Sequence, residues 1–493
     1  RAMYNNSWHH SNSGQRARAT MIRDQWARDC MIAMGNADGG HGHFIHLYLN
    51  GLYWGVYNLH ERLENDHYAA YNGFEDDEVL GLNPGRLTSE ESSSFNSMKS
   101  LVANTRTTWA RIQRVIDVDN YIDFVIAEYF GRNADLKNND NWRAAGGGAA
   151  NAPWRFYCWD TERILEDETN TSAPSNSGAL DGALIFDDLE RFREFRVRFA
   201  DRAYKHLFHG GALTNLANRN RFQKYADQID TAIICESARW GDDRSGGGSN
   251  GNYTRDENWT RAVYGTPGGP GTSPGNGVLG SWFPTSGTNR TDRMISTWRS
   301  RRFSGTSDTY LGTIQPPLFT VDGGAQHGGD IPAGGTLSAT AASGSIYYTT
   351  DGTDPRLEGG NLAPGAILLS GQITLPSSGL VRMRARVGGG DAWSPLSEAF
   401  FYLERRATAS DLRITEINYN ALPASALEAS DGANLPIPRL YRGGDFEFIE
   451  ISNVSDSAVT LDGVQFTDGI TFTFPVINLQ PAGYVIIVAD LEG

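Results

Sequence analysis

The stretch Arg132-Asn-Ala-Asp-Leu-Lys-Asn-Asn-Asp-Asn-Trp142 follows an apolar run with helical spacing, Asp119 to Phe130. A second stretch, Trp154-Arg-Phe-Tyr-Cys-Trp-Asp-Thr-Glu162, starts with aromatic residues and ends with two carboxylates. The helical period predicts a buried helix, and the aromatic run predicts a short strand. We therefore predict an α+β domain in which polar loops follow a helix and a strand.

Working outward, His43 to Leu59 predicts a β-hairpin, because Asn50-Gly51 separates two runs of aromatic and aliphatic residues. Two further helices are predicted, over Leu189 to Phe208 and over Thr214 to Trp240. The stretch from Gly246 to Gly280 is rich in Gly, Pro, Ser and Asn, which predicts a loop without periodicity.

After Arg302 the pattern changes to short β-rich runs that alternate with Gly, Pro and Asp turns. We predict a multidomain chain, in which an α+β domain over residues 1–305 is followed by two all-β sandwich domains over 315–403 and 410–493. We expect the first domain to be incomplete at its N-terminus and the last at its C-terminus. The predicted strands include Ser345–Thr350, Val381–Val387, Glu398–Leu403, Leu412–Ile417, Phe446–Ser452 and Tyr484–Ala489.

The overall composition excludes some classes of protein. The chain has 493 residues, 58 acidic and 43 basic side chains, and a formal charge of −15. This acidic balance argues against nucleic acid as the main partner, because phosphate binding needs a basic surface. No apolar run of about 18 residues occurs, so we expect no membrane span.

Carboxylates and amides in the two polar stretches have the pattern that phosphoryl transfer to a hydroxyl requires. Asp135 would orient the acceptor hydroxyl. Asn139 or Asn141 would supply an amide ligand to a metal, with Asp160 as the main metal ligand and Glu162 in support. Asn and Asp clusters also form turns that hydrogen-bond their own backbone, so the spacing alone leaves both interpretations open.

Several elements in the same order resemble the CotH kinase family. The segment from Leu47 to Glu61 is similar to that family's Asn-Gly-x-x-x-Gly-x-Tyr-x-x-x-Glu signature. The Asp135–Asn141 loop and the Trp159–Glu162 segment resemble its catalytic and metal-binding loops. Later stretches around Glu236-Ser-Ala-Arg-Trp-Gly-Asp242 and Phe283-Pro284 also match.

This resemblance implies an atypical kinase-like fold, with Asp135 as the catalytic residue and Asp160 as the metal-binding one. It places Glu61 either at the nucleotide or in a structural role, and Arg62 and Lys137 beside the cofactor. Kinases hold the nucleotide phosphates with a lysine, yet no lysine precedes Lys99. The alternatives are a lysine upstream of residue 1, a substitute such as Arg62 or Arg86, or poor nucleotide binding.

The two later modules resemble other families. Ile346-Tyr-Tyr-Thr-Thr-Asp-Gly-Thr-Asp-Pro355 is similar to the hallmark of the chitobiase and β-hexosaminidase C-terminal domain. The stretches Arg413–Asn420 and Phe446–Asn453 resemble a lamin-tail domain. Both resemblances imply immunoglobulin-like sandwiches without catalytic residues. Aromatic residues of the first module either stack on sugars or form its core, namely Tyr347, Tyr348 and Trp393.

The function that these resemblances imply is transfer of the ATP γ-phosphoryl group, with Mg²⁺ or Mn²⁺, to Ser or Thr. The expected substrate is a secreted or surface protein, and the expected location is extracellular or in the cell envelope. Cell-wall or other polysaccharide is a further expected partner. The alternative is a non-catalytic surface or adhesion protein with a degenerate kinase-like scaffold.

Overall fold

The computed structural model describes residues 6–137, 140–173, 185–244, 251–265, 277–331, 335–375, 378–403, 405–419 and 446–488. The chain divides into two compact units. Unit 1 contains Arg1–Pro316 together with two later loops, Arg356–Asn361 and Arg384–Ser397. Unit 2 contains Pro317–Pro355, Leu362–Met383 and Glu398–Gly493.

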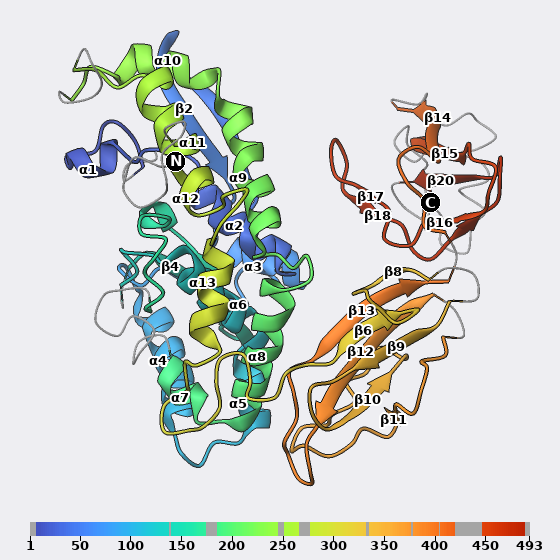
Figure 1. Cartoon of the computed structure of the whole chain (residues 1–493). Helices are drawn as coiled ribbons and strands as arrows, with labels where there is room; N and C mark the ends of the chain where they lie inside the picture. Colours follow the sequence, from blue (N-terminus) through green and yellow to red (C-terminus); the bar gives the residue numbers. More distant parts are fainter. Residues whose placement is uncertain are drawn as a thin grey trace, which may run out of the picture. The chain divides into compact units, whose positions relative to one another are not determined.

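Helix α6 (Val118–Gly131) lies in the core of unit 1 and confirms the helix predicted over Asp119 to Phe130 (Figure 1). Asp117 caps its N-terminus by accepting a hydrogen bond from the Asn120 N–H. All residues of the helix except Asp119 are buried, because apolar side chains occur on every face of the helix. It contacts α2 (Arg23–Ala33), β5 (Ala152–Cys158), α8 (Arg193–Leu207) and α13 (Arg290–Trp298).

Two antiparallel sheets complete unit 1. The predicted hairpin is confirmed as β1 (Gly42–Leu49) and β2 (Leu52–His60), with Asn50 and Gly51 both at positive φ in the turn. The second sheet has the order β3 (Leu80–Leu82), β4 (Trp142–Gly147), β5. Strand β4 starts where the first polar stretch ends, and β5 ends immediately before Trp159, so this sheet fixes both polar loops.

Each of the two longer predicted helices is in fact a pair of helices. The first consists of α7 (Phe186–Glu190) and α8, separated by the extended backbone of Phe192. The second consists of α9 (Asn215–Ile229) and α10 (Ala232–Trp240). Tertiary contacts cause these breaks, since α9 packs on α2 whereas α10 packs on β2.

The prediction of a loop over Gly246 to Gly280 is wrong where the structure describes that stretch. A π-helical turn at Arg255–Trp259 continues into α11 (Thr260–Tyr264), and α12 covers Gly277–Ser281. Their apolar side chains enter the core, which overrides the composition. The remaining helices are α1 (Ser13–Arg16), α3 (Asn65–Asn72), α4 (Ser89–Ala103), α5 (Trp109–Val115) and the 3₁₀ turn Thr161–Arg163.

Unit 2 is built from several small sheets, as the change in sequence pattern predicts. A five-stranded sheet has the order β11-β10-β12-β13-β8, and three-stranded sheets have the orders β7-β6-β9 and β14-β15-β20. Two-stranded sheets pair β16 with β19 and β17 with β18. The strands are β6 (Leu318–Val321), β7 (Gly324–Ala325), β8 (Gly329–Asp330), β9 (Leu337–Thr340), β10 (Ser345–Thr349), β11 (Ile367–Leu368), β12 (Gly379–Arg386), β13 (Ser397–Tyr402), β14 (Leu412–Asn418), β15 (Phe448–Asn453), β16 (Val459–Thr460), β17 (Gln465–Phe466), β18 (Phe472–Thr473), β19 (Asn478–Leu479) and β20 (Tyr484–Val488).

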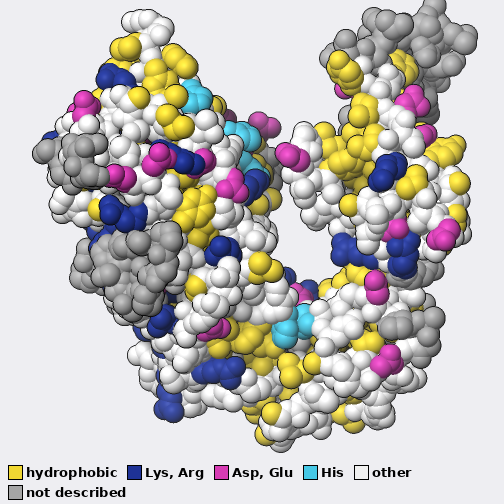
Figure 2. Space-filling model, turned by 45° about the horizontal axis from the view of Figure 1, so that its top comes forward, with side chains coloured by type: hydrophobic (Ala, Val, Ile, Leu, Met, Phe, Trp, Pro, Cys, Tyr) yellow, Lys and Arg dark blue, Asp and Glu magenta, His cyan; other side chains and the backbone are white. Residues whose placement is uncertain are grey.

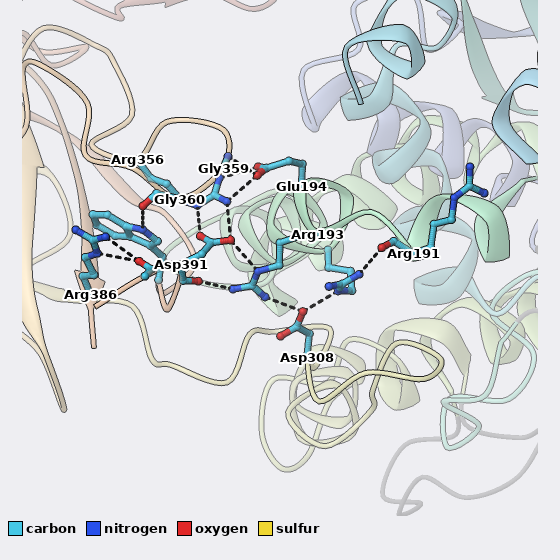
Figure 3. A network of polar contacts seen from close by, with 12 residues as sticks. Arg191, Arg193, Glu194, Asp308, Arg356, Gly359, Gly360, Arg386 and Asp391 are labelled. Carbon is cyan, nitrogen blue, oxygen red and sulfur yellow. Dashed lines mark hydrogen bonds and ion pairs between the residues drawn. The ribbon is translucent and has the colours of Figure 1, made fainter. Parts of the chain in front are cut away.

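The two late loops join unit 1 through a network of charged side chains on α8 (Figure 3). Glu194 accepts two hydrogen bonds from Arg356, of 2.7 and 2.8 Å. Arg193 reaches Asp391 at 3.0 Å and Asp308 at 2.7 Å. These pairs are partly or fully buried, so they hold the loops more firmly than surface ion pairs would.

The indole of Trp393 belongs to the same network. It is 5% exposed, its Nε1 donates to the Gly360 carbonyl at 2.8 Å, and the Arg386 guanidinium lies 5.0 Å from its ring centroid. Tyr348 is also buried. Trp393 and Tyr348 therefore pack inside the protein. Of the two roles that the sequence leaves open, stacking on sugars or forming the core, this position favours the core.

The surface is mixed in character. On the face drawn in Figure 2, Lys and Arg side chains occur in separate groups among acidic, apolar and uncharged ones. Within the described part of the chain, no helix has both the length and the apolar character needed to cross a membrane.

Candidate active site

The loop that follows α6 is held by its own amide side chains. Arg132 ends the helix in the left-handed conformation, and the Asn133 Oδ1 then accepts the Asp135 backbone N–H at 3.0 Å. The Asn141 Nδ2 donates to the Asp135 carbonyl at 2.6 Å. The Asp/Asn cluster therefore does form backbone-bonded turns, and those same bonds fix the position of Asp135.

The side chain of Asp135 stays accessible in this loop. It is 24% exposed, and its Oδ1 lies 3.1 Å from the Lys137 Nζ, which is 43% exposed. The structure thus brings together two predicted site residues, the carboxylate and the ammonium. Asn139 lies outside the described residues, which leaves Asn141 as the amide that can be described.

The segment after β5 positions the second predicted carboxylate. Asp160 adopts the left-handed conformation, with φ of 58°, and turns the chain into Thr161–Arg163. Asp24 on α2 anchors this turn, since its Oδ1 accepts both the N–H and the hydroxyl of Thr161, at 2.9 and 3.0 Å. Glu162 is 1% exposed, so its carboxyl is an interior group.

The two loops are joined by backbone hydrogen bonds. The Ala134 N–H donates to the Arg163 carbonyl, and the Leu165 N–H donates to the Gly131 carbonyl, both at 2.9 Å. Asp135 therefore lies one residue from a bond to the turn that starts at Asp160. This juxtaposition is the central feature of the site.

Glu61, at the end of β2, is held by structural contacts. Its Oε1 accepts the Tyr71 hydroxyl at 2.9 Å, and its Oε2 accepts the His41 N–H at 2.8 Å. The Arg62 side chain is 73% exposed and pairs with Glu64 at 2.8 Å. These contacts favour the structural alternative for Glu61 and direct Arg62 to the surface.

Arg28 on α2 links three of the predicted segments, although the sequence patterns did not identify it. Its side chain is fully buried, and its Nε pairs with the Asp24 Oδ2 at 3.0 Å. Its guanidinium lies 5.1 Å from the Trp159 ring centroid, and its Nη1 lies 3.5 Å from the Glu61 carbonyl oxygen. The signal in the sequence is the i,i+4 pair of Asp24 and Arg28 on one helix face.

A buried carboxyl lies behind the site, on α6. Glu128 is 1% exposed, and burial raises its pKa to about 7, against the opposing effect of the neighbouring Asn133 and Cys158 side chains. Burial also raises the pKa of Cys158 well above the usual value of a thiol. A proton on Glu128 is therefore retained close to neutral pH, next to the residue that anchors Asp135.

By chemical type, Asp160, Glu162 and Asn141 carry oxygen donors, the kind of ligand that Mg²⁺ and Mn²⁺ prefer. The described residues hold no cluster of three or more His, Cys, Asp or Glu side chains that could bind a metal. Mg²⁺ needs no such cage, because it is commonly held by one or two carboxylates plus substrate phosphates.

Comparison with known protein families finds a match for this part of the chain. The family model described as CotH kinase protein matches residues 3–262. The match spans the hairpin, both loops of the site and helix α10. No curated protein matches the chain.

Proposed function

The chain belongs to the CotH kinase protein family, and we propose that its first unit transfers the γ-phosphoryl group of ATP to Ser or Thr of another protein. The observation that carries the proposal is the backbone pairing of Ala134 with Arg163, which sets the Asp135 loop beside the Asp160 turn. A kinase needs these two carboxylates together, one at the acceptor hydroxyl and one at the metal.

Each residue has a defined part in this proposal. Asp135 accepts a hydrogen bond from the acceptor hydroxyl and takes its proton as the phosphoryl group moves. Lys137, 3.1 Å from Asp135, offers a positive charge to the transferred group. Asn141 keeps the loop in place through the Asp135 carbonyl.

Asp160, Glu162 and Asn141 would hold Mg²⁺ or Mn²⁺, which when bound neutralises charge on the ATP phosphates. Arg28 would have a structural role in the site, because it connects Asp24 and Trp159 to the segment at Glu61. Asp24 in turn fixes the Thr161 backbone next to Asp160.

The proposal also covers the acceptor protein, the location of the chain and the role of its later β-rich modules. The acceptor would be a secreted or surface protein, and the chain would act outside the cell or in its envelope. We propose immunoglobulin-like sandwiches of the chitobiase C-terminal and lamin-tail types for residues 315–403 and 410–493. They would serve as spacers or attach to polysaccharide.

The second candidate is a non-catalytic surface protein built on the same scaffold. The observation that favours it is the exposed position of the Arg62 side chain, which pairs with Glu64. Under this alternative the fold would be retained for packing and the two carboxylates would not act on a nucleotide.

Calorimetric titration of ATP with Mg²⁺ or Mn²⁺ into the whole chain separates these two functions. We expect metal-dependent binding to the unmodified chain and to Asp135→Asn, and its loss in Asp160→Asn. Arg106→Gln, at an exposed position, serves as the control. A folded chain that binds no nucleotide with either metal would favour the scaffold.

A further inference from the structure

A cavity of about 630 Å³ lies beside the candidate active site in unit 1. One wall is the chain after the Asp160 turn, from Leu165 to Asn170, and another is formed by Arg132 and Ala134. Ala134 directly precedes Asp135, so the cavity is adjacent to the place where an acceptor hydroxyl would bind. The inference drawn from it rests on the proposed kinase function.

The lining has three acidic residues, Glu166, Asp167 and Glu168, and the first two are already engaged. The Glu166 carboxylate accepts hydrogen bonds from Arg163 at 2.6 Å and from Arg18 at 3.3 Å. The Asp167 Oδ1 accepts the N–H and the hydroxyl of Thr169, at 3.2 and 2.7 Å. These carboxylates are therefore poorly available to a cationic ligand.

Two buried arginines at the cavity donate their hydrogen bonds to uncharged groups. The Arg23 guanidinium donates hydrogen bonds to the carbonyls of Ile164 and Arg18 and to the Thr20 hydroxyl. Arg290, whose guanidinium stacks at 4.8 Å over the wall residue Trp282, binds only backbone carbonyls.

Burial is the main cause of the lowered pKa values of these arginines. It lowers the pKa of Arg23 to about 10, where the charge of Glu166 opposes the shift and those of Arg18 and Arg163 add to it. It lowers the pKa of Arg290 to about 9, where Arg132 adds to the shift and Asp167 opposes it. An anion in the cavity would stabilise the charged form of both guanidinium groups.

Arg132 has a donor available within this environment. Its Nε is buried and has no hydrogen-bond partner among the described residues. Its backbone is fixed in the left-handed conformation at the end of α6, with φ of 54°. A buried donor without a partner is costly, and an anionic ligand would satisfy it.

We propose that this cavity binds an anionic side chain of the acceptor protein, a carboxylate or a phosphomonoester, next to the hydroxyl held by Asp135. The kinase would accordingly select Ser or Thr residues that have an acidic or phosphorylated neighbour. Arg132 and Arg18 would donate hydrogen bonds to the anion, and the positive charges of Arg23 and Arg290 would add to the electrostatic attraction.

Titration calorimetry on the whole chain with two probes, O-phosphoserine and N-acetylaspartate, tests this site. We expect at least one probe to bind, with an affinity reduced tenfold or more in both Arg132→Gln and Arg18→Gln. The exposed control Arg106→Gln should bind as the unmodified chain does. Preference for one probe identifies whether the natural group is a phosphate or a carboxylate.

The proposal is overturned if neither probe binds, or if both variants bind like the control. Asp160→Asn separates this outcome from failure of the proposed kinase function, since it should lose ATP yet retain probe binding. A chain that binds a probe but no nucleotide would keep the anion site and remove the kinase.

Discussion

The Asn141 side-chain amide donates to the Asp135 backbone carbonyl across six residues, at 2.6 Å. Asn141 itself has a φ of 65°, a conformation that Asn tolerates better than most residues with a Cβ. One residue thus supplies both the turn and the bond that positions the candidate catalytic carboxylate.

Replacing Asn141 should separate these two contributions. Asn141→Ala loses a hydrogen bond worth about 1 kcal/mol and adds left-handed strain of about 1 kcal/mol. Asn141→Gly loses only the bond. We therefore expect the alanine variant to be the less stable of the two, as measured by urea unfolding. Equal losses would show that the backbone conformation contributes nothing.

Buried Glu128 makes the stability of unit 1 depend on pH. Its folded-state pKa of about 7 exceeds the usual 4.5, so the unfolded chain releases this proton at lower pH than the folded one. The free energy of unfolding should therefore fall as the pH rises from 4.5 to 7, and this group should contribute on the order of 3 kcal/mol to the decline. Glu128→Gln should flatten that part of the unfolding profile.

Glu236 adds a second slope of the same sign, since burial raises its pKa to about 7 although its carboxylate accepts the Val56 N–H. The profile of Glu128→Gln should therefore keep a remaining decline that Glu236→Gln removes. An unchanged slope in Glu128→Gln would contradict the assignment.

The ion pair between Arg384 and Asp201 should matter far more than one at the surface. Two bonds of 2.8 and 2.6 Å join them, and the Arg384 side chain is 1% exposed. Asp201→Asn removes the counter-charge and should cost about 3–5 kcal/mol. The exposed pair of Arg198 and Asp119 is the matched control, and Asp119→Asn should cost less than about 1 kcal/mol.

Thermal and urea unfolding of these two variants provide the measurement. The double variant Asp201→Asn/Arg384→Met should recover part of the loss, because the buried charge is gone. Similar costs for Asp201→Asn and Asp119→Asn would show that the network does not hold the late loops.

Gly40 tests the importance of Arg28. A Cβ at Gly40 would come within 2.6 Å of the Arg28 Nη1, whereas at Gly35, with nearly the same positive φ, it would meet nothing within 4 Å. Gly40→Ala should therefore lose at least about 1 kcal/mol more than Gly35→Ala, beyond the strain that both share. It should also weaken ATP binding, measured by calorimetry, whereas Gly35→Ala should not.

Local signals predicted much of unit 1, and long-range contacts explain the rest. The hairpin followed from Asn50-Gly51, and α6 followed from its apolar period. The break at Phe192 and the helices inside the Gly-rich stretch did not, because they depend on packing against distant elements. Periodicity shows which residues are apolar and does not show how the chain turns.

The candidate site shows the same division. The polar stretches around Asp135 and Asp160 could be identified from residue types, and the structure joins them by hydrogen bonds. Arg28 was missed because its role arises from contacts with Trp159 and the Glu61 segment, which are remote in sequence. Nothing in the sequence indicated that Ala134, between Asn133 and Asp135, lines a cavity.

The two late loops also determine when unit 1 can finish folding. Glu194 pairs with Arg356, 162 positions further along the chain, and Arg193 pairs with Asp391, 198 positions further along. During synthesis at roughly 5–20 residues per second, the ribosome needs several seconds to pass from Pro316 to Ser397. Throughout that interval the nascent N-terminal unit exists without its last contacts, and a nonsense codon in the downstream region would damage a unit that lies almost wholly upstream of it.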